Sequence, residues 1–331
     1  MRPGALRRER MTACSCRRAK QFASRRAKQF ARRWRFRPPM ETQDRIIQGM
    51  AVEGHFRVLA AQTTTAVETA REILDLSPVG AEALGRAMTG ALLLARLLAK
   101  DVRNQYVTLR FEGDGPLGTV IADGTISGGV RGYVENPAPE EAMDVESAIG
   151  NGSLTVIRGT PPTGKPYTSQ ILLGGSGIAT DLTRYLMRSE QIASAVMLGV
   201  LNKRDGVAAA GGIVIQSFPG APEEAIQTIE KRVREAPPLS TLLEKMEIEE
   251  AVATILHGAD YKQVDSGYAI PVAYTCQCNR ERALAPLALL GQDDLREMID
   301  EGGTEVRCQF CGRRYPFSAE DLYTLTAEHD V

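Results

Sequence analysis

The chain has 331 residues, of which 43% are hydrophobic and 24% charged, and its formal net charge is −1. That composition is typical of a globular protein with a sizeable core. No run of 18 apolar residues occurs, so we predict no membrane-spanning helix and no membrane partner. Residues 1–39 hold 14 Lys and Arg against one acid, whereas the remainder is acidic. An acidic body lacks the basic face that phosphate groups require, which argues against nucleic acid as the main partner.

The basic leader, residues 1–39, contains an imperfect eight-residue repeat, seen in residues 17–24 and 25–32. A segment this charged is expected to be disordered by itself. We interpret it as no working part of the native protein, with the natural start at Met40. An organelle transit peptide and a nucleic-acid-binding or membrane-binding arm are the alternatives. Its Cys14 and Cys16 have no second cysteine pair nearby, and we treat them as incidental.

The first elements after the leader are predicted to be helical. Apolar residues recur at helical spacing over residues 56–75. Ser77 followed by Pro78 is typical of an N-cap and a first helical position. The helix that they begin should be well buried, because Leu84 and Met88 share one apolar face with further Ala and Leu residues.

Short strands joined by tight turns follow, which indicates antiparallel pairing. Polar and apolar residues alternate from Tyr106 to Phe111, and a Gly-rich turn comes next. Further strands are expected at residues 117–124, 128–134, 152–159, 167–173, 194–202 and 206–218, with a helix over residues 176–189. Helices interspersed with hairpins predict an α+β fold, in which residues 40–218 form an antiparallel sheet with packed helices.

The character of the chain changes at Pro219. Between Glu223 and Asp265 there are ten acids against five bases, and Pro237-Pro238 interrupts the helical pattern. Residues 219–272 are therefore predicted to be an acidic helical linker, weakly packed by its composition. Residues 273–331 are predicted to be a small C-terminal domain that holds the remaining cysteines.

Two other patterns are not expected to carry chemistry. The stretch "GTPPTGKP", residues 159–166, nearly matches a phosphate-binding loop, but Pro166 stands where a magnesium-binding hydroxyl is required. We interpret it as a hairpin loop. His55, His257 and His329 are scattered over different segments, so none is predicted to be a catalytic base, and we expect no enzyme activity.

Four cysteines form two close pairs, Cys276-x-Cys278 and Cys308-x-x-Cys311. Two such pairs on separate loops are the usual ligand supply of a tetrahedral zinc site, and the glycine after Cys311 favours a zinc knuckle. Helices are expected at residues 280–290 and 293–300 between the pairs. A domain this small buries too little apolar surface to be secure alone. The free energy of zinc binding then contributes directly to the folding of this domain. Oxidation of the thiolates can therefore act as a switch between the folded and unfolded domain.

The spacing of the cysteines leaves other readings open. A purely structural zinc site without switching fits it equally well. Structural disulfides of an exported protein and a thioredoxin-like thiol-disulfide oxidoreductase are further alternatives. A zinc-ribbon nucleic-acid binder would use Arg307, Arg313 and Arg314 together with the basic leader.

The two cysteine pairs, placed after an α+β domain and an acidic helical linker, resemble the redox-regulated 33 kDa chaperonin family (heat shock protein 33). The similarity runs from about Met40 to the end of the chain. Other stretches look similar as well, namely "ALGRAMTGALLLA" from Ala83, "GDGPLG" from Gly113, "VRGYVENP" from Val130 and "IATDLTRYLMRSEQIASAVMLGV" from Ile178. The combination of these stretches is specific for the family. Apart from the four cysteines, none of the stretches would be specific for the family by itself.

The resemblance implies an ATP-independent holdase chaperone of the bacterial cytosol, inactive while reduced and zinc-bound. It implies Cys276, Cys278, Cys308 and Cys311 as ligands of one Zn2+ ion. Under oxidative stress the zinc would leave, the disulfides Cys276–Cys278 and Cys308–Cys311 would form, and the linker would lose structure. Unfolding client proteins would bind the exposed surface, and activated chains would form a homodimer. The family does not account for residues 1–39.

Overall fold

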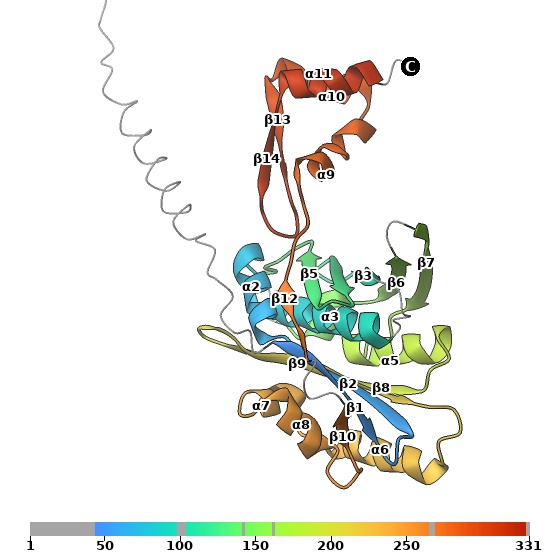
Figure 1. The fold of residues 1–331 in the computed structure, drawn as a ribbon. Helices are drawn as coiled ribbons and strands as arrows, with labels where there is room; N and C mark the ends of the chain where they lie inside the picture. Colours follow the sequence, from blue (N-terminus) through green and yellow to red (C-terminus); the bar gives the residue numbers. More distant parts are fainter. Residues whose placement is uncertain (1–43, 98–103, 141–142, 161–162, 265–268, 329–331) are drawn as a thin grey trace, which may run out of the picture. The chain divides into compact units, whose positions relative to one another are not determined.

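The protein is described by a computed structural model over residues 44–97, 104–140, 143–160, 163–264 and 269–328. The predictions for residues 1–39, including Cys14 and Cys16, lie outside these ranges. Two six-stranded sheets carry most of the described strands (Figure 1). The first sheet has the order β10-β1-β2-β9-β8, and β11 also pairs with β1. Its strands are β1 (Arg45–Ala51), β2 (Phe56–Gln62), β8 (Ser194–Lys203), β9 (Gly206–Ser217), β10 (Lys262–Val264) and β11 (Ile270–Pro271).

The second sheet has the order β12-β5-β4-β3-β6-β7. Its pairs are antiparallel except for β12, which lies parallel to β5 at the sheet edge. The predicted α+β class with antiparallel strands is confirmed. Its strands are β3 (Tyr106–Gly113), β4 (Thr119–Thr125), β5 (Gly129–Val134), β6 (Gly152–Thr160), β7 (Thr163–Leu172) and β12 (Ala273–Tyr274).

Helix α3 (Pro78–Leu97) packs against strands of both sheets (Figure 1). Most of its residues are buried. Its start is the predicted one, because the Ser77 hydroxyl accepts a hydrogen bond from the Gly80 amide at 3.2 Å. Small residues let the neighbours approach closely. A Cβ at Gly85 would lie 2.7 Å from Val67 and 2.8 Å from Val200. The helices α2 (Thr64–Leu74), α4 (Val145–Ile149) and α5 (Ile178–Ser189) complete this part of the chain.

The prediction of a helix over residues 56–75 is wrong in its first half. Residues 56–62 form β2, and only α2 is helical. Successive residues of β2 face different cores, with Leu59 in one cluster and Val58 in the other. A strand that is buried on both faces has no polar alternation, so its apolar run cannot be distinguished from a helix by period.

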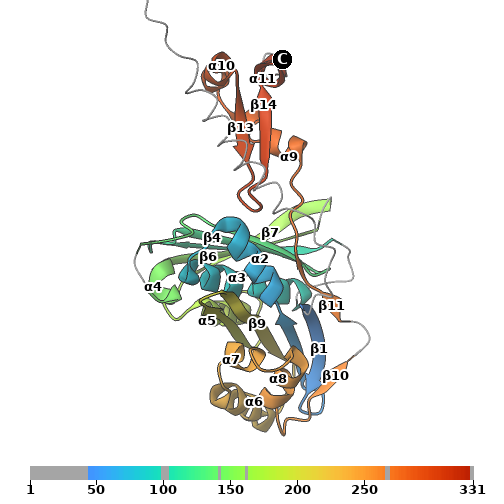
Figure 2. The same ribbon diagram turned by 90° about the vertical axis from the view of Figure 1, so that its left-hand side faces the viewer.

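The acidic segment after Pro219 folds onto the first sheet, on the face opposite α3 (Figure 2). Its helices are α6 (Glu223–Glu235), α7 (Leu239–Leu243) and α8 (Ile248–Ile255). Ile248, Ala251 and Val252 of α8 are fully buried against the sheet. The expectation of weak packing is therefore wrong for α8, because its apolar residues share one buried face and its Glu249 forms an ion pair with Arg45 of β1.

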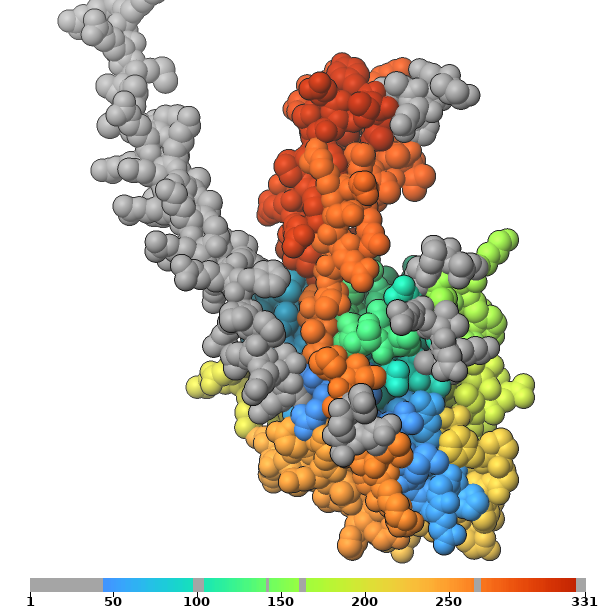
Figure 3. All heavy atoms as spheres, viewed as in Figure 1, coloured from blue at the N-terminus to red at the C-terminus, as the bar shows by residue number. Residues whose placement is uncertain are grey.

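Two short strands continue this segment along the free edge of β1. β10 pairs with residues 48–50, and β11 pairs with Arg45 and Ile46. In Figure 3 the orange atoms of this segment lie beside the blue atoms of β1. The domain boundaries expected after residues 218 and 272 stay predictions.

The C-terminal segment has a small core of its own. Leu295, Phe317 and Leu322 are its best-buried side chains. The helix expected over residues 280–290 is interrupted, since Pro286 removes a backbone donor and a 3-10 turn follows. The elements are α9 (Arg280–Leu284), η1 (Leu287–Leu289), α10 (Gln292–Asp300), β13 (Gly303–Arg307), β14 (Arg314–Ser318) and α11 (Ala319–Glu328).

Candidate metal centre

The four predicted ligands come together from two segments. Cys276 and Cys278 follow β12, and Cys308 and Cys311 lie in the turn between β13 and β14. Their sulfur atoms all lie within 4.8 Å of one another, and all four residues are half-buried. None of the four forms a disulfide in this structure.

The spacing of the sulfurs suits a metal ion. The Sγ atoms of Cys276 and Cys308 are 3.7 Å apart, and those of Cys278 and Cys311 are 3.3 Å apart. A tetrahedron of thiolates around zinc, with Zn–S bonds of about 2.3 Å, has edges of about 3.8 Å. A covalent S–S bond is only about 2.05 Å long. The four thiols therefore match a metal cage in donor type, number and size.

The turn that carries Cys308 and Cys311 is held by backbone hydrogen bonds. The amide of Cys308 donates to the carbonyl of Arg313 at 2.8 Å, and the amide of Gly312 donates to that of Cys308 at 2.8 Å. Gly312 has a φ of 68°, a conformation that favours glycine. This is the knuckle geometry that the Cys-x-x-Cys-Gly sequence predicts.

The loop that carries the other pair is held at both ends. Before it, the amide of Thr275 donates to the carbonyl of Val130 on β5 at 2.8 Å. After it, the side chain of Asn279 caps α9 by accepting from the amide of Arg282 at 2.8 Å. Arg282 also donates to the carbonyl of Gln277 at 2.8 Å. The chain between Cys276 and Cys278 is thus placed by an edge strand and a helix cap.

The electrostatics of the thiols are unequal. Burial raises the pKa of Cys276 and of Cys311 above the ordinary thiol value. Burial also acts on Cys278, but the hydroxyl of Tyr315, which donates to its Sγ at 3.1 Å, and the neighbouring thiols outweigh it and lower its pKa to about 7. Cys278 is therefore the first of these three to become a thiolate, the form that binds metals and reacts with oxidants.

Two residues beside the cysteines were not predicted from the sequence. Arg131 on β5 lies with its Nη1 3.9 Å from the sulfur of Cys276, and its Nε donates to Asp123 at 2.8 Å. The hydroxyl of Tyr274 donates to the carbonyls of Gly132 and Phe310. The "VRGYVENP" stretch contains Arg131 and Gly132, but nothing in its pattern indicates that it meets a segment some 140 positions away.

The histidines take no part in this cluster. His55 lies in the turn after β1, and His257 follows α8, whereas His329 lies outside the described residues. The stretch at residues 159–166 spans the β6–β7 connection, in line with the hairpin interpretation. Within the part of the chain that the structure describes, no helix is both long and apolar enough to cross a bilayer.

Comparison with known proteins decides the family. Residues 44–318 match the family model described as "Hsp33 protein". The chain belongs to the Hsp33 family. Among curated relatives of this Hsp33 chain, a 33 kDa chaperonin of Thermus thermophilus is 44% identical over 298 residues, which cover 86% of this chain and 87% of the relative. That of Limosilactobacillus fermentum is 40% identical over 295 residues, which cover 86% and 99%.

The fold of this Hsp33 chain agrees with a solved structure. The crystal structure of the 33 kDa chaperonin (heat shock protein 33 homolog) from Thermotoga maritima aligns with a TM-score of 0.78 at 35% identity, covering 87% of this chain and 100% of that one. The resemblance inferred from the cysteine pattern is confirmed. Hsp33 is a chaperone family, so the partners of the chain are client proteins.

Proposed function

We propose that the chain is a redox-regulated, ATP-independent holdase whose switch is a Zn2+ site formed by Cys276, Cys278, Cys308 and Cys311. The observation that carries this proposal is the convergence of the four free thiols within 4.8 Å of one another. When bound there, zinc supplies folding free energy on the order of 10–16 kcal/mol to a domain with a small core. We further propose that the protein is cytoplasmic and not an enzyme, and that neither nucleic acid nor a membrane is its partner.

The proposed oxidation step converts each pair of thiolates into one disulfide, Cys276–Cys278 and Cys308–Cys311. Each new S–S bond releases two electrons, which reduce one molecule of peroxide. The peroxide O–O bond breaks, two protons are taken up, and two waters leave. A disulfide sulfur has lost the thiolate charge that holds zinc, so oxidation abolishes the cage and releases the ion.

We propose that loss of the metal site destabilises the linker through β12, because this strand ends two residues before Cys276 and pairs with β5. Unfolding of the C-terminal domain removes the support for this short strand. Farther along the linker, α7 and α8 cover apolar residues of the first sheet, among them Ile47, Val58 and Ile213. When the linker loses structure, this apolar face becomes available to unfolding clients, and activated chains form a homodimer.

The test combines zinc release with client protection in one experiment. Reduced, zinc-loaded protein is treated with peroxide at mildly raised temperature, with a chromophoric chelator reporting zinc and light scattering reporting aggregation of a thermally unfolding reporter enzyme. We expect release of about one zinc ion per chain, followed by suppression of scattering without ATP. A Cys276→Ser variant should lose regulation, whereas a variant with Cys14→Ser and Cys16→Ser should behave as the parent. Oxidised, zinc-free protein that fails to protect the reporter would refute the holdase proposal.

A further inference from the structure

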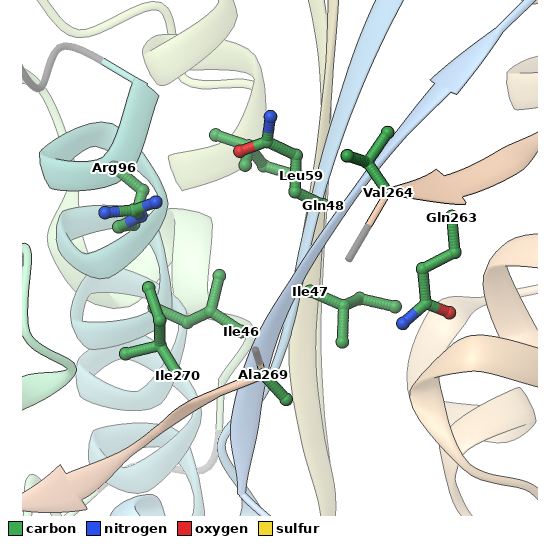
Figure 4. A pocket seen from close by; sticks show the side chains of 9 residues that line it. All are labelled: Ile46, Ile47, Gln48, Leu59, Arg96, Gln263, Val264, Ala269 and Ile270. Atoms are coloured by element: carbon green, nitrogen blue, oxygen red, sulfur yellow. The ribbon is translucent and has the colours of Figure 1, made fainter. Parts of the chain in front are cut away.

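The linker covers one face of the first sheet, and successive residues of its strands divide between the two faces. In the close-up of Figure 4, Ile47 of β1 lies on the side of Gln263 of β10, whereas Ile46 lies on the side of Arg96 of α3. Accordingly, Ile47 belongs to the core that the linker completes, and Ile46 belongs to the core around α3. The face that holds Ile47 is therefore the one that opening of the linker uncovers.

Two glycines leave a gap in the side-chain layer of that face. Gly199 of β8 and Gly211 of β9 are paired across the antiparallel ladder, and both are buried. Residues two positions away on each strand point to the same face, because side chains alternate along a strand. These flanking residues are apolar and belong to the core beneath the linker: Met197, Leu201, Ala209 and Ile213. We call the glycine pair and these four neighbours the glycine-pair site.

Helix α7 occupies the glycine-pair site, since it packs against β8 and β9. Its Leu239, Leu242 and Leu243 are buried, and their spacing of three and four positions places them on one face of a helix. A Cβ on Gly211 would overlap the Cδ1 atom of Leu243. The end of this leucine therefore fills space that a side chain at position 211 would close.

The backbone of α7 approaches the other glycine closely. A Cβ on Gly199 would lie 2.8 Å from the backbone nitrogen of Ser240 and 3.0 Å from its Cβ, and its three nearest neighbours would all be atoms of Ser240. The residue after the first leucine thus lies directly against the strand, which favours a small side chain there. The site therefore favours a helix with the order leucine, small residue, any residue, leucine, leucine.

Helix α7 depends on this contact for its structure. It has only five residues, and a helix so short is not stable by itself, because nucleation is costly. The residue that follows it, Glu244, forms an ion pair with Lys203 of β8, but this lysine is 58% exposed and exposed pairs contribute little. When the linker opens, another helix with the same three leucines can therefore take its place.

We propose that the glycine-pair site, once uncovered, binds a helical segment of the client that carries leucine-type side chains at positions i, i+3 and i+4 and a small residue at i+1. Unfolding proteins retain short fluctuating helices, so clients offer such segments. While the linker is closed, α7 fills the site in place of the client. This inference rests on the proposed function, because it names the part of a client that the uncovered face binds.

The test uses an alanine-rich helical peptide that contains Leu-Ser-Ala-Leu-Leu and carries a fluorophore. Fluorescence anisotropy measures its binding to the reduced, zinc-loaded full chain. This assay needs neither oxidation nor client protection, so the two proposals can fail separately. In the parent, α7 competes at a high effective concentration and should keep binding weak. Leu243→Ala removes one anchor of α7 and keeps the site, so it should bind the peptide about tenfold more tightly or better.

Blocking the site should have the opposite effect on the peptide. In the Leu243→Ala background, Gly199→Ala places a methyl group against the helix backbone, so we expect peptide binding to weaken by about tenfold or more. Hydrogen exchange of the α7 amides should stay as fast as in Leu243→Ala or become faster, which shows that α7 has not returned to the site. Gly291→Ala, whose added Cβ meets no atom closer than 3.6 Å, is the matched control and should leave peptide binding unchanged.

A second peptide, with Phe in place of Ser, tests the small residue and should bind at least about tenfold more weakly. The proposal is overturned if Leu243→Ala binds the first peptide no better than the parent does. It is equally overturned if Gly199→Ala binds that peptide as tightly as Gly291→Ala, or if the peptide with Phe binds as well. Dimers of Leu243→Ala that exclude the peptide would assign the site to a second copy of the chain and also overturn the proposal.

Discussion

The guanidinium of Arg131 lies over the ring of Phe310, 4.1 Å from its centroid. Phe310 stands between Cys308 and Cys311, and Arg131 belongs to β5 of the second sheet, where Asp123 holds it in an ion pair. One side chain thus touches an acid of the sheet, the sulfur of Cys276 and the cysteine turn. This contact connects the candidate metal centre to the strand on which β12 docks.

Replacing Arg131 should therefore loosen the metal centre without altering its ligands. For Arg131→Gln we expect zinc transfer to a chelator to be about fivefold faster, corresponding to a loss of ~1 kcal/mol of cation–π and charge interaction. Transfer is followed by the absorbance of the chelator complex in reduced protein. Arg110→Gln on β3 of the same sheet, whose arginine pairs only with Glu112 among the contacts described, is the control and should leave the rate unchanged. An equal rate for Arg131→Gln would show that this contact does not hold the centre.

The hydroxyl of Tyr315 should contribute to zinc affinity. It donates to the sulfur of Cys278 and, against the effect of burial, helps to lower the pKa of that thiol to about 7. Tyr315→Phe removes this hydrogen bond and keeps the ring, so we expect zinc affinity to fall by about tenfold, as for other lost partners of metal ligands. Competition with a chelator of known affinity measures the change. Tyr133→Phe on β5 is the control, and a similar loss there would indicate a general destabilisation.

Packing of α8 should set how easily the linker opens. Ile248 is fully buried beneath the first sheet, and Ile248→Ala should cost about 2–5 kcal/mol in the free energy of opening or unfolding. Hydrogen exchange of the α8 amides measures how far the free energy of local opening has fallen. The peroxide concentration needed for client protection should fall as this free energy falls. Glu250→Ala on the exposed face of the same helix should leave both quantities near the parent values. Unchanged exchange in Ile248→Ala would mean that α8 is not a stabilising part of the docked linker.

Asp44 should make stability depend on pH. It is 1% exposed, and burial raises its pKa from 3.8 to about 6 in spite of the hydrogen bond that it accepts from the amide of Ala66. Because the folded-state pKa lies above the unfolded one, the stabilisation from the neutral form is complete below about pH 3.8 and is lost as the pH rises through about 6. That difference corresponds to about 3 kcal/mol.

The variant Asp44→Asn removes this titration while keeping an oxygen acceptor for Ala66. Its free energy of unfolding minus that of the parent should therefore rise by about 3 kcal/mol between pH 3.8 and pH 7. Denaturant unfolding of both proteins at matched pH and zinc concentration measures the difference. A difference that stays flat across this range would contradict a buried, neutral Asp44 at acidic pH.

Much of the local structure follows from the sequence, for reasons visible at particular residues. Ser77 and Pro78 begin α3 as expected, because capping depends on a few adjacent groups. Gly312 permits the backbone turn after Cys311 for the same local reason. Residues 56–62 could not be assigned correctly, because both faces of β2 are buried and burial on both faces is a property of the assembled sheets.

The sequence by itself singled out the four cysteines of the candidate site, since two close pairs on separate loops are the usual ligand supply of a tetrahedral metal site. The tertiary structure alone decided what surrounds them. Arg131 reaches Cys276 across a sequence separation of 145 positions, and Arg45 of β1 pairs with Glu249 of α8 across a separation of 204. Such contacts depend on how distant segments pack together in the folded chain. The alternation of residues in a strand indicates which of its faces is buried, but it does not indicate which distant segment will pack beside the strand.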